Sequence, residues 1–178
     1  MRTTVIIPTF NAAQNLPKIV SEIFTLPLDI KILVVDDKSP DGTGQIADEL
    51  ATIHRGRLSV IHRPGKLGLS SAYLQAFHHL FQTDAQLIVQ MDADFSHDPS
   101  ALITMTQKIE SFDLVLGSRY IPGGSTDKNW PFWRKGLSAW GNFYARTILG
   151  MPIRDVTGGY RMWRKETLQR MPLDRVRS

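Results

Sequence analysis

Five short apolar runs alternate with stretches of helical periodicity along the first two thirds of the chain. They span residues 3–7, 29–35, 58–62, 87–91 and 113–117. Runs of this length, rich in β-branched residues, predict buried strands. Because each of the first four is followed by a helical stretch, the pattern favours β-α-β units with parallel pairing. We expect an α/β fold with a Rossmann-like, mostly parallel sheet covered by helices on both faces.

Start signals and apolar spacing place the helices between these runs. Asn15 and Pro17 mark the start of the first helix, and Asp98 and Pro99 mark the start of the fourth, as N-cap and first helical residue. The predicted helices span about residues 16–24, 43–53, 69–81 and 99–109. Pro8 is expected to end the first strand. The remainder is less regular, and it predicts a loop at 119–131, a helix at about 132–149 and an extended piece at 155–162.

The fourth apolar run leads directly into Asp92 and Asp94, which are separated by Ala93. Both carboxylates then follow the C-terminal end of a strand, where ligands bind in open α/β sheets. Oxygen ligands of this kind suit Mg²⁺ or Mn²⁺, and phosphate oxygens can complete the coordination shell. The alternative is an ordinary polar turn, since aspartate is common in turns.

A second acidic pair, Asp36 and Asp37, follows the second run at the same predicted sheet edge. Two acidic clusters on one edge repel each other unless a cation lies between them or they take separate roles. A glycine-containing loop at residues 65–71 enters the third helix, and it is either a ligand-binding loop or a plain strand-to-helix turn. The chain has no Gly-x-Gly-x-x-Gly after its first strand and no P-loop motif, which argues against dinucleotide-binding and P-loop folds.

Composition excludes several function classes. The 178 residues suffice for a globular domain with a core, and the absence of cysteine excludes disulfides, thiolate nucleophiles and cysteine-ligated zinc. The net charge of +4 is too small to indicate nucleic acid but favours diphosphates or lipid phosphates as ligands. No run approaches the roughly 18 apolar residues of a membrane span, and the N-terminal run is a strand rather than a signal peptide, so we expect a cytoplasmic protein.

Ordered motifs extend along nearly the whole chain. They are Ile7-Pro8-Thr9-Phe10-Asn11, Val35-Asp36-Asp37, Ser39-Pro40-Asp41-Gly42-Thr43, Lys66-Leu67-Gly68, Asp92-Ala93-Asp94, Gly117-Ser118-Arg119-Tyr120, Asn129-Trp130-Pro131, Gly141-Asn142 and Asp155-Val156-Thr157-Gly158-Gly159-Tyr160-Arg161. With these motifs the chain resembles the family 2 glycosyltransferases of the GT-A fold. Within that family it is similar to the polyprenol (dolichol) monophosphate mannose synthases.

The resemblance implies inverting, metal-dependent transfer of mannose from GDP-mannose to a polyprenyl phosphate. Asp92 and Asp94 would hold Mg²⁺ or Mn²⁺, with Asp94 and Arg119 as catalytic residues. The expected nucleotide-sugar contacts are Pro8, Thr9, Asn11, Val35, Asp37, Lys66, Asp92, Ala93, Asp94 and Arg119. The expected acceptor-side residues are Asp155, Arg161 and Arg134. We expect a single catalytic domain over 1–178, with a nucleotide-binding half at about 1–117 and an acceptor-side half at about 118–178.

The chain departs from the family pattern at Ala12, where glutamate is frequent, at Ser96, where glutamine is common, and at Ser70. Relatives continue beyond the position of Arg161 with a further strand and helix, so we expect a chain truncated at its C-terminus. The alternatives are therefore a transferase that uses UDP-glucose or another nucleotide sugar, and a nucleotide-sugar-binding module without turnover. A basic aromatic stretch around Trp130, Trp133 and Arg134 suits peripheral contact with the cytoplasmic membrane face.

Overall fold

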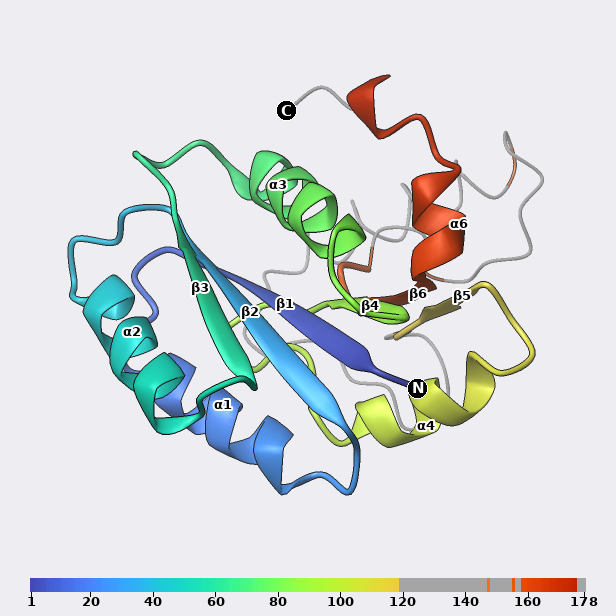
Figure 1. The fold of residues 1–178 in the computed structure, drawn as a ribbon, viewed down its shortest axis with the longest axis horizontal. Helices are drawn as coiled ribbons and strands as arrows, with labels where there is room; N and C mark the ends of the chain where they lie inside the picture. The colour runs from blue at the N-terminus through green and yellow to red at the C-terminus, as the bar shows by residue number, and fades with distance from the viewer. Residues whose placement is uncertain (119–146, 148–154, 156–157, 176–178) are drawn as a thin grey trace.

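The computed structural model describes residues 1–118, 147, 155 and 158–175. Within these residues the chain forms a six-stranded sheet in the order β3-β2-β1-β4-β6-β5, with helices on both faces (Figure 1). The strands are β1 (Thr3–Thr9), β2 (Ile30–Asp36), β3 (Leu58–His62), β4 (Leu87–Gln90), β5 (Leu114–Leu116) and β6 (Arg161–Arg164). The helices are α1 (Leu16–Thr25), α2 (Thr43–Ile53), α3 (Leu69–Phe81), α4 (Ala101–Lys108), α6 (Lys165–Gln169) and the 3-10 turn η1 (Leu173–Arg175).

The sheet is mostly parallel, as predicted. β1 lies at its centre and pairs in parallel with β2 on one side and with β4 on the other, and β2 pairs in parallel with β3. β6 is antiparallel to both of its neighbours, β4 and β5. The carboxyl ends of β1, β2, β3 and β4 therefore lie along one edge of the sheet.

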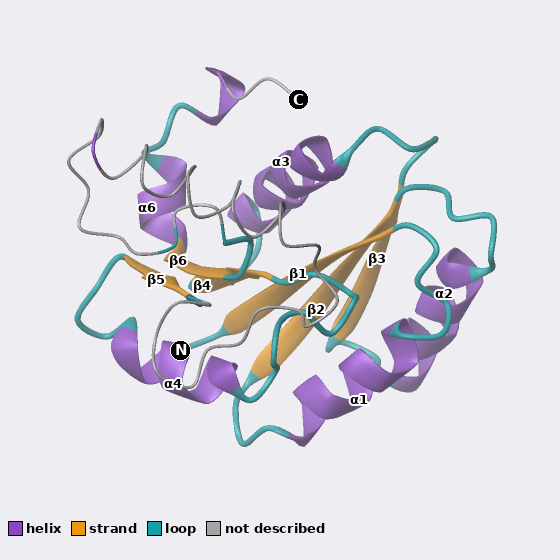
Figure 2. Ribbon diagram, turned by 180° about the vertical axis from the view of Figure 1, so that it is seen from behind, coloured by secondary structure: helices purple, strands orange, loops and turns teal. Residues whose placement is uncertain are grey.

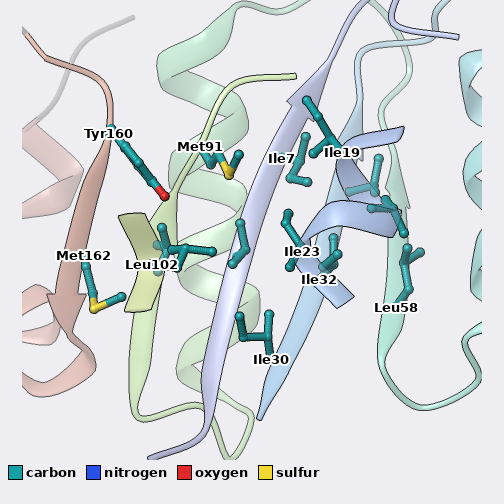
Figure 3. Close-up of a cluster of buried hydrophobic side chains, with 14 of the residues drawn as sticks. Ile7, Ile19, Ile23, Ile30, Ile32, Leu58, Met91, Leu102, Tyr160 and Met162 are labelled. Carbon is teal, nitrogen blue, oxygen red and sulfur yellow. The ribbon is translucent and has the colours of Figure 1, made fainter. Parts of the chain in front are cut away.

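Two hydrophobic clusters cover opposite faces of the sheet, because successive strand residues point to opposite sides. On one face α1, α2 and α4 pack over side chains that include Ile7, Met91 and Met162 (Figure 3). On the other face α3 and α6 pack over side chains that include Ile6 and Trp163. Figure 2 shows the two helical layers on either side of the strands. The prediction of helices on both faces is confirmed.

β1 continues through Pro8 to Thr9, so the prediction that Pro8 ends this strand is wrong. Pro8 pairs with Val35 of β2, whereas the pairing of β1 with β4 ends at Ile6. The side of Pro8 that faces away from β2 thus has no strand partner, and a proline is tolerated where the ladder needs no donor from it.

The fourth helix begins at Ala101 rather than at Pro99. The carboxylate of Asp98 accepts a hydrogen bond from the main-chain N–H of Ser100 at 2.8 Å. Aspartate side chains commonly accept a hydrogen bond from the main-chain N–H two residues later, which forms a turn. The helix starts after this turn.

β6 is the element whose position the sequence pattern did not predict. Residues 155–162 were expected as an extended piece, and the strand Arg161–Arg164 lies between β4 and β5. Its four residues are too few to show a clear alternation. Met162 enters one core cluster and Trp163 the other, where the indole N–H donates to Gln90 Oε1 at 2.9 Å.

The loop predicted at 119–131 and the helix predicted at about 132–149, apart from residue 147, lie outside the described residues. Among the described helices, none combines the length and the apolar character that crossing a membrane requires.

Gly117 provides a test of the packing between β5 and the segment that precedes β6. A Cβ atom at this position would lie 2.8 Å from Tyr160 Cδ1, and the ring of Tyr160 is buried. We expect Gly117→Ala to lower the free energy of unfolding by about 1–3 kcal/mol, because the packed ring cannot give way without strain. Gly65→Ala is the matched control, since a Cβ there meets no atom within 4 Å, and it should stay within about 0.5 kcal/mol. Equal effects of the two substitutions in urea unfolding would contradict this packing.

Candidate functional site

The loops at the carboxyl edge of the sheet bring the predicted polar residues together. Asp36 and Asp37 lie at the end of β2, Arg63 follows β3, and Asp92 and Asp94 follow β4. In open α/β sheets ligands bind outside this edge. The Asp36–Asp37 pair and the Asp92–Asp94 pair, however, lie in different environments.

Asp36 is buried and joins the loop after β2 to the end of β1. Its carboxylate accepts hydrogen bonds from Thr9 Oγ1 and from the main-chain N–H of Ser39, each at 3.0 Å. The hydroxyl of Ser39 also accepts a hydrogen bond from the main-chain N–H of Asn11 at 3.1 Å, and Asn11 has a φ of 59°. Thr9 and Asn11, two of the predicted nucleotide-sugar contacts, are therefore held by the loop after β2.

Asp41 anchors the same two loops further out. Its carboxylate accepts hydrogen bonds from the Thr43 hydroxyl at 2.6 Å and from the main-chain N–H of Ala13 at 3.1 Å. The bond from the Thr43 hydroxyl is the main cause that holds the pKa of Asp41 below its ordinary value. The Thr43 hydroxyl in turn accepts a hydrogen bond from the main-chain N–H of Ala12 at 2.9 Å. The loop that carries Ala12 is thus held through its main-chain N–H groups by the side chains of Thr43 and Asp41.

Asp37 forms a buried ion pair with Arg63, and their side chains are 9% and 2% exposed. The other carboxylate oxygen of Asp37 accepts main-chain N–H bonds from Leu67 and Gly68, both at 3.1 Å. Arg63 also donates to Ser71 Oγ at 2.6 Å. Asp37 therefore organises the glycine-containing loop that leads into α3.

Sequence reasoning did not single out Arg63. Its place in the sequence could have indicated it, because Arg63 comes directly after the third strand. That strand lies next to the strand that ends in two aspartates. The guanidinium of Arg63 compensates the charge of Asp37 from the side of β3, away from Asp92 and Asp94. The role of Asp37 as a nucleotide contact stays a prediction.

Lys66 and Phe10 connect the loop after β3 with the loop after β1. The Nζ atom of Lys66 lies 3.9 Å from the centroid of the Phe10 ring, a cation–π contact, and Phe10 is 38% exposed. Of the other predicted nucleotide contacts, Pro8 is half-buried at the end of β1 and Val35 is buried beneath α3. Ala93 is half-buried between the two aspartates that follow β4.

Asp92 is held by contacts from two directions. Its Oδ1 atom accepts a hydrogen bond from the hydroxyl of Tyr73 on α3 at 3.2 Å, and its main-chain N–H donates to His97 Nδ1 at 3.0 Å. Burial, followed by the negative charge of Asp92, raises the pKa of Tyr73 well above its ordinary value. The phenol therefore keeps its proton and acts as a donor at neutral pH.

The hydrogen bond to His97 Nδ1 determines the tautomer of this ring. A nitrogen that accepts a hydrogen bond carries no proton, so the ring proton is on Nε2. His97 Nε2 lies 4.0 Å from Asp92 Oδ2. While this arrangement holds, Nε2 carries the ring proton and is not a metal ligand.

Gly159 leaves space beside the second oxygen of Asp92. A Cβ atom at residue 159 would lie 3.5 Å from Asp92 Oδ2 and 3.4 Å from His97 Cε1. The next residue, Tyr160, stacks on the His97 ring with centroids 4.8 Å apart, and its hydroxyl donates to the main-chain carbonyl of Asp98 at 3.1 Å. The segment before β6 thus forms one wall of the site.

Asp94 is more exposed to solvent than Asp92. Its Oδ1 accepts the main-chain N–H of Ser96 at 2.9 Å, and the following residue, Phe95, has a φ of 62° that turns the chain. Burial acts to raise the pKa of Asp94, but hydrogen bonds from the side chain and main chain of Ser96 outweigh it and leave the pKa below its ordinary value. Asp94 is consequently an ionised carboxylate at neutral pH.

The carboxylates of Asp92 and Asp94 provide some of the oxygen ligands that a hard divalent cation needs. Carboxylate oxygens suit Mg²⁺ and Mn²⁺, and a Cβ at Gly159 would fill the space next to Asp92 Oδ2. Within the part of the chain that the structure describes, no group of three or more histidine, aspartate or glutamate side chains is arranged to hold a metal ion. Asp92 and Asp94 would therefore supply part of a coordination shell, which ligand phosphates and water would complete.

Two hollows lie along this edge of the protein. One of about 490 Å³ lies between the ends of β2 and β3 and the start of α2, and its lining includes Asp36, Lys38, Gly44 and His62. A smaller one of about 170 Å³ is lined by Asn11, Ala12, Gln14, Asn15 and Asp41. The larger is within the size range of ligand pockets.

The predicted acceptor-side residues are placed unequally. Arg161 opens β6, pairs with Gln90 of β4, and donates from Nε to the carbonyl of Gly158 at 2.9 Å. Asp155 is buried, and its carboxylate lies close to Gly158. Arg119 and Arg134 lie outside the described residues.

This combination of fold and site corresponds to a known family of enzymes. The model of the Glycosyl transferase family 2 matches residues 4–171. The chain belongs to this family, and by class it is a glycosyltransferase.

Curated relatives show which members of the family the chain is similar to. The chain is 47% identical to the polyprenol monophosphomannose synthase of Mycolicibacterium smegmatis, over 99% of this chain and 67% of that protein. It is 40% identical to the undecaprenyl-phosphate mannosyltransferase of Micrococcus luteus, over 100% of this chain and 72% of that protein. It is 35% identical to the dolichol-phosphate mannosyltransferase of Pyrococcus furiosus, over 99% of this chain and 50% of that protein.

Solved structures share the fold. A mannosyltransferase from Pyrobaculum calidifontis, in complex with GDP-Man and Mn²⁺, has a TM-score of 0.67 at 22% identity, over 97% of this chain and 48% of that one. The glucosyl-3-phosphoglycerate synthase of Mycobacterium tuberculosis, in complex with Mn²⁺, UDP-glucose and phosphoglyceric acid, has a TM-score of 0.64 at 19% identity, over 94% of this chain and 57% of that one. The predicted GT-A fold is confirmed, and this chain spans about half the length of these two structures.

The Arg63–Asp37 pair offers a second test of the site's architecture. Replacing Arg63 with methionine leaves the buried carboxylate of Asp37 without its counter-charge, and we expect a loss of about 3–5 kcal/mol in the free energy of unfolding. Arg55→Met is the matched control, because Arg55 is exposed and should change stability by less than about 0.5 kcal/mol. Denaturant unfolding distinguishes the two, and a similar small change in both variants would show that the pair does not stabilise the fold.

Proposed function

We propose that this chain catalyses inverting, metal-dependent transfer of mannose from GDP-mannose to a polyprenyl phosphate. The observation that carries the proposal is the identity of 47% and 40%, over 99% and 100% of this chain, with a polyprenol monophosphomannose synthase and an undecaprenyl-phosphate mannosyltransferase. The carboxylates of Asp92 and Asp94, which lie together at the carboxyl edge of the sheet, support it. Mg²⁺ and Mn²⁺ both suit this donor chemistry.

The reaction needs no general base in this account. The acceptor phosphate is ionised at neutral pH, so its oxygen attacks the anomeric carbon of the mannosyl group directly. The bond from that carbon to the diphosphate breaks, and GDP leaves with the electron pair. A bound divalent cation supplies charge neutralisation for the departing diphosphate. Inversion then requires in-line placement of acceptor and leaving group.

Residues of the chain would share the remaining tasks. Asp92 and Asp94 would bind the cation that holds the diphosphate, and Asp94 would thereby take part in catalysis. His97 would donate from Nε2 to an oxygen of the diphosphate, in agreement with its tautomer. Arg161 brings a positive charge to the same edge, because its strand pairs with β4. We propose that this charge acts on the acceptor phosphate.

The remaining predicted contacts belong to the same proposal. Around the nucleotide sugar these are Pro8, Thr9, Asn11, Val35, Asp37, Lys66, Ala93 and Arg119, and on the acceptor side they are Asp155 and Arg134. A polyprenyl acceptor is insoluble in water, so the enzyme would work at a membrane surface, on its cytoplasmic face.

Metal-dependent nucleotide binding tests this proposal through Asp92. We expect Asp92→Asn to weaken binding of GDP-mannose in the presence of Mn²⁺ by about 10-fold or more, because a metal-binding carboxylate oxygen becomes a neutral amide. Calorimetric titration with and without Mn²⁺ measures this. Glu49→Gln, on the exposed face of α2, is the charge-matched control and should bind as the wild type does.

The same titrations separate the alternatives. Metal-dependent affinity that is unchanged in Asp92→Asn would remove the metal role from this residue. Preference of the wild-type chain for UDP-glucose would replace the donor, and binding of GDP-mannose without transfer to a polyprenyl phosphate would indicate a binding module.

A further inference from the structure

Tyr73 engages one oxygen of the carboxylate that the proposed function assigns to the metal. Its hydroxyl donates to Asp92 Oδ1 at 3.2 Å. The other oxygen, Oδ2, lies on the side of His97 Nε2 and Gly159. The two oxygens of Asp92 are therefore not equivalent.

The position of Tyr73 is determined by packing. The residue is 7% exposed within α3, in the core cluster that also holds Ala76 and Phe77, and its ring stacks on Phe77 with centroids 6.2 Å apart. The main-chain N–H of Asp92 is held separately by His97 Nδ1. Because both the main chain and Oδ1 are held, rotation of the carboxylate would break the bond from Tyr73.

We propose that Tyr73 is a positioning residue that sets the metal selectivity of the site, by reserving Asp92 Oδ1 so that the carboxylate meets a cation through Oδ2 alone. This inference rests on the proposed function, since it takes Asp92 as a metal ligand. It assigns to α3 a part in cation choice, although α3 itself carries no metal-binding residue in the proposed site.

The physical basis is the difference between small and large divalent cations. Mg²⁺ demands near-ideal octahedral geometry with short oxygen contacts, which one oxygen per carboxylate provides. Ca²⁺ accepts six to eight oxygens and often takes both oxygens of a carboxylate. A carboxylate whose Oδ1 is occupied by a phenol favours the first kind of coordination. Freeing Oδ1 allows the second.

The test is competition among cations at the Tyr73→Phe variant, which removes the hydroxyl and keeps the ring. Mn²⁺ is titrated into the chain with saturating GDP while electron paramagnetic resonance follows the free ion, and Mg²⁺ and Ca²⁺ are then used as competitors. We expect the dissociation constants for Mn²⁺ and Mg²⁺ to rise about 10-fold, as is typical when a residue that orients a metal ligand is lost. The constant for Ca²⁺ should stay within about 3-fold or fall, because bidentate binding becomes possible.

Thr106→Val is the control, since it removes a half-buried hydroxyl of α4 whose partner is the main-chain carbonyl of Leu102, away from the site. Its ratio of Ca²⁺ to Mg²⁺ affinity should equal that of the wild type within about 2-fold. Urea unfolding of both variants reports any general loss of stability, which would weaken all cations alike.

The outcomes separate the inference from the proposed function. A selective loss of Mn²⁺ and Mg²⁺ in Tyr73→Phe supports the inference. Equal weakening of all three cations, or no change in any, overturns it while leaving the proposed function intact if the wild type binds Mn²⁺ with GDP. A wild-type chain that binds no Mn²⁺ in the presence of GDP overturns both.

Discussion

The antiparallel pairing of β6 with β4 is the interaction on which the candidate site depends. It places a strand from the C-terminal part of the chain directly beside the strand that leads into Asp92. The residues just before β6 then form a wall of the site: Gly159 lies against Asp92 and His97, and Tyr160 stacks on His97. Arg161 is carried to the same edge. Without this pairing Asp92 would keep its contacts with Tyr73 of α3 and with His97, but the wall beside its Oδ2 atom would be absent.

The two acidic pairs at this edge differ in role: Asp36 and Asp37 hold the loops, whereas Asp92 and Asp94 can meet a ligand. Asp36 and Asp37 are buried, and hydroxyl groups, main-chain N–H groups and the guanidinium of Arg63 occupy their oxygens. They fix the loops that surround the site. Asp92 and Asp94 are less buried and retain oxygen atoms that can meet a cation. Because Arg63 compensates the charge of Asp37 and hydrogen-bond donors occupy the oxygens of Asp36, the first pair is engaged within the protein, whereas the second pair can meet a ligand.

Local patterns were sufficient for β1 to β5 and α1 to α4, because each of these elements buries an apolar face of its own period. They also placed Asp92 and Asp94, since a residue that follows a parallel strand lies at the ligand-binding edge. β6 was not predictable in this way: its four residues owe their state to non-local pairing with β4 and β5. Arg63 and Tyr73 were missed for a related reason, because whether either side chain faces an aspartate depends on how its segment packs against the sheet.

The central claim is that this edge of the sheet transfers mannose to a lipid phosphate with the help of a divalent cation. The most direct measurement is incubation of the chain with radiolabelled GDP-mannose, a short polyprenyl phosphate in detergent and Mn²⁺, followed by extraction of the lipid. The account predicts a mannosylated polyprenyl phosphate that forms with Mn²⁺, ceases to form after chelation, and does not form when the acceptor lacks its phosphate. Lipid product that accumulates equally with and without the metal, or binding of GDP-mannose with no lipid product, would contradict it.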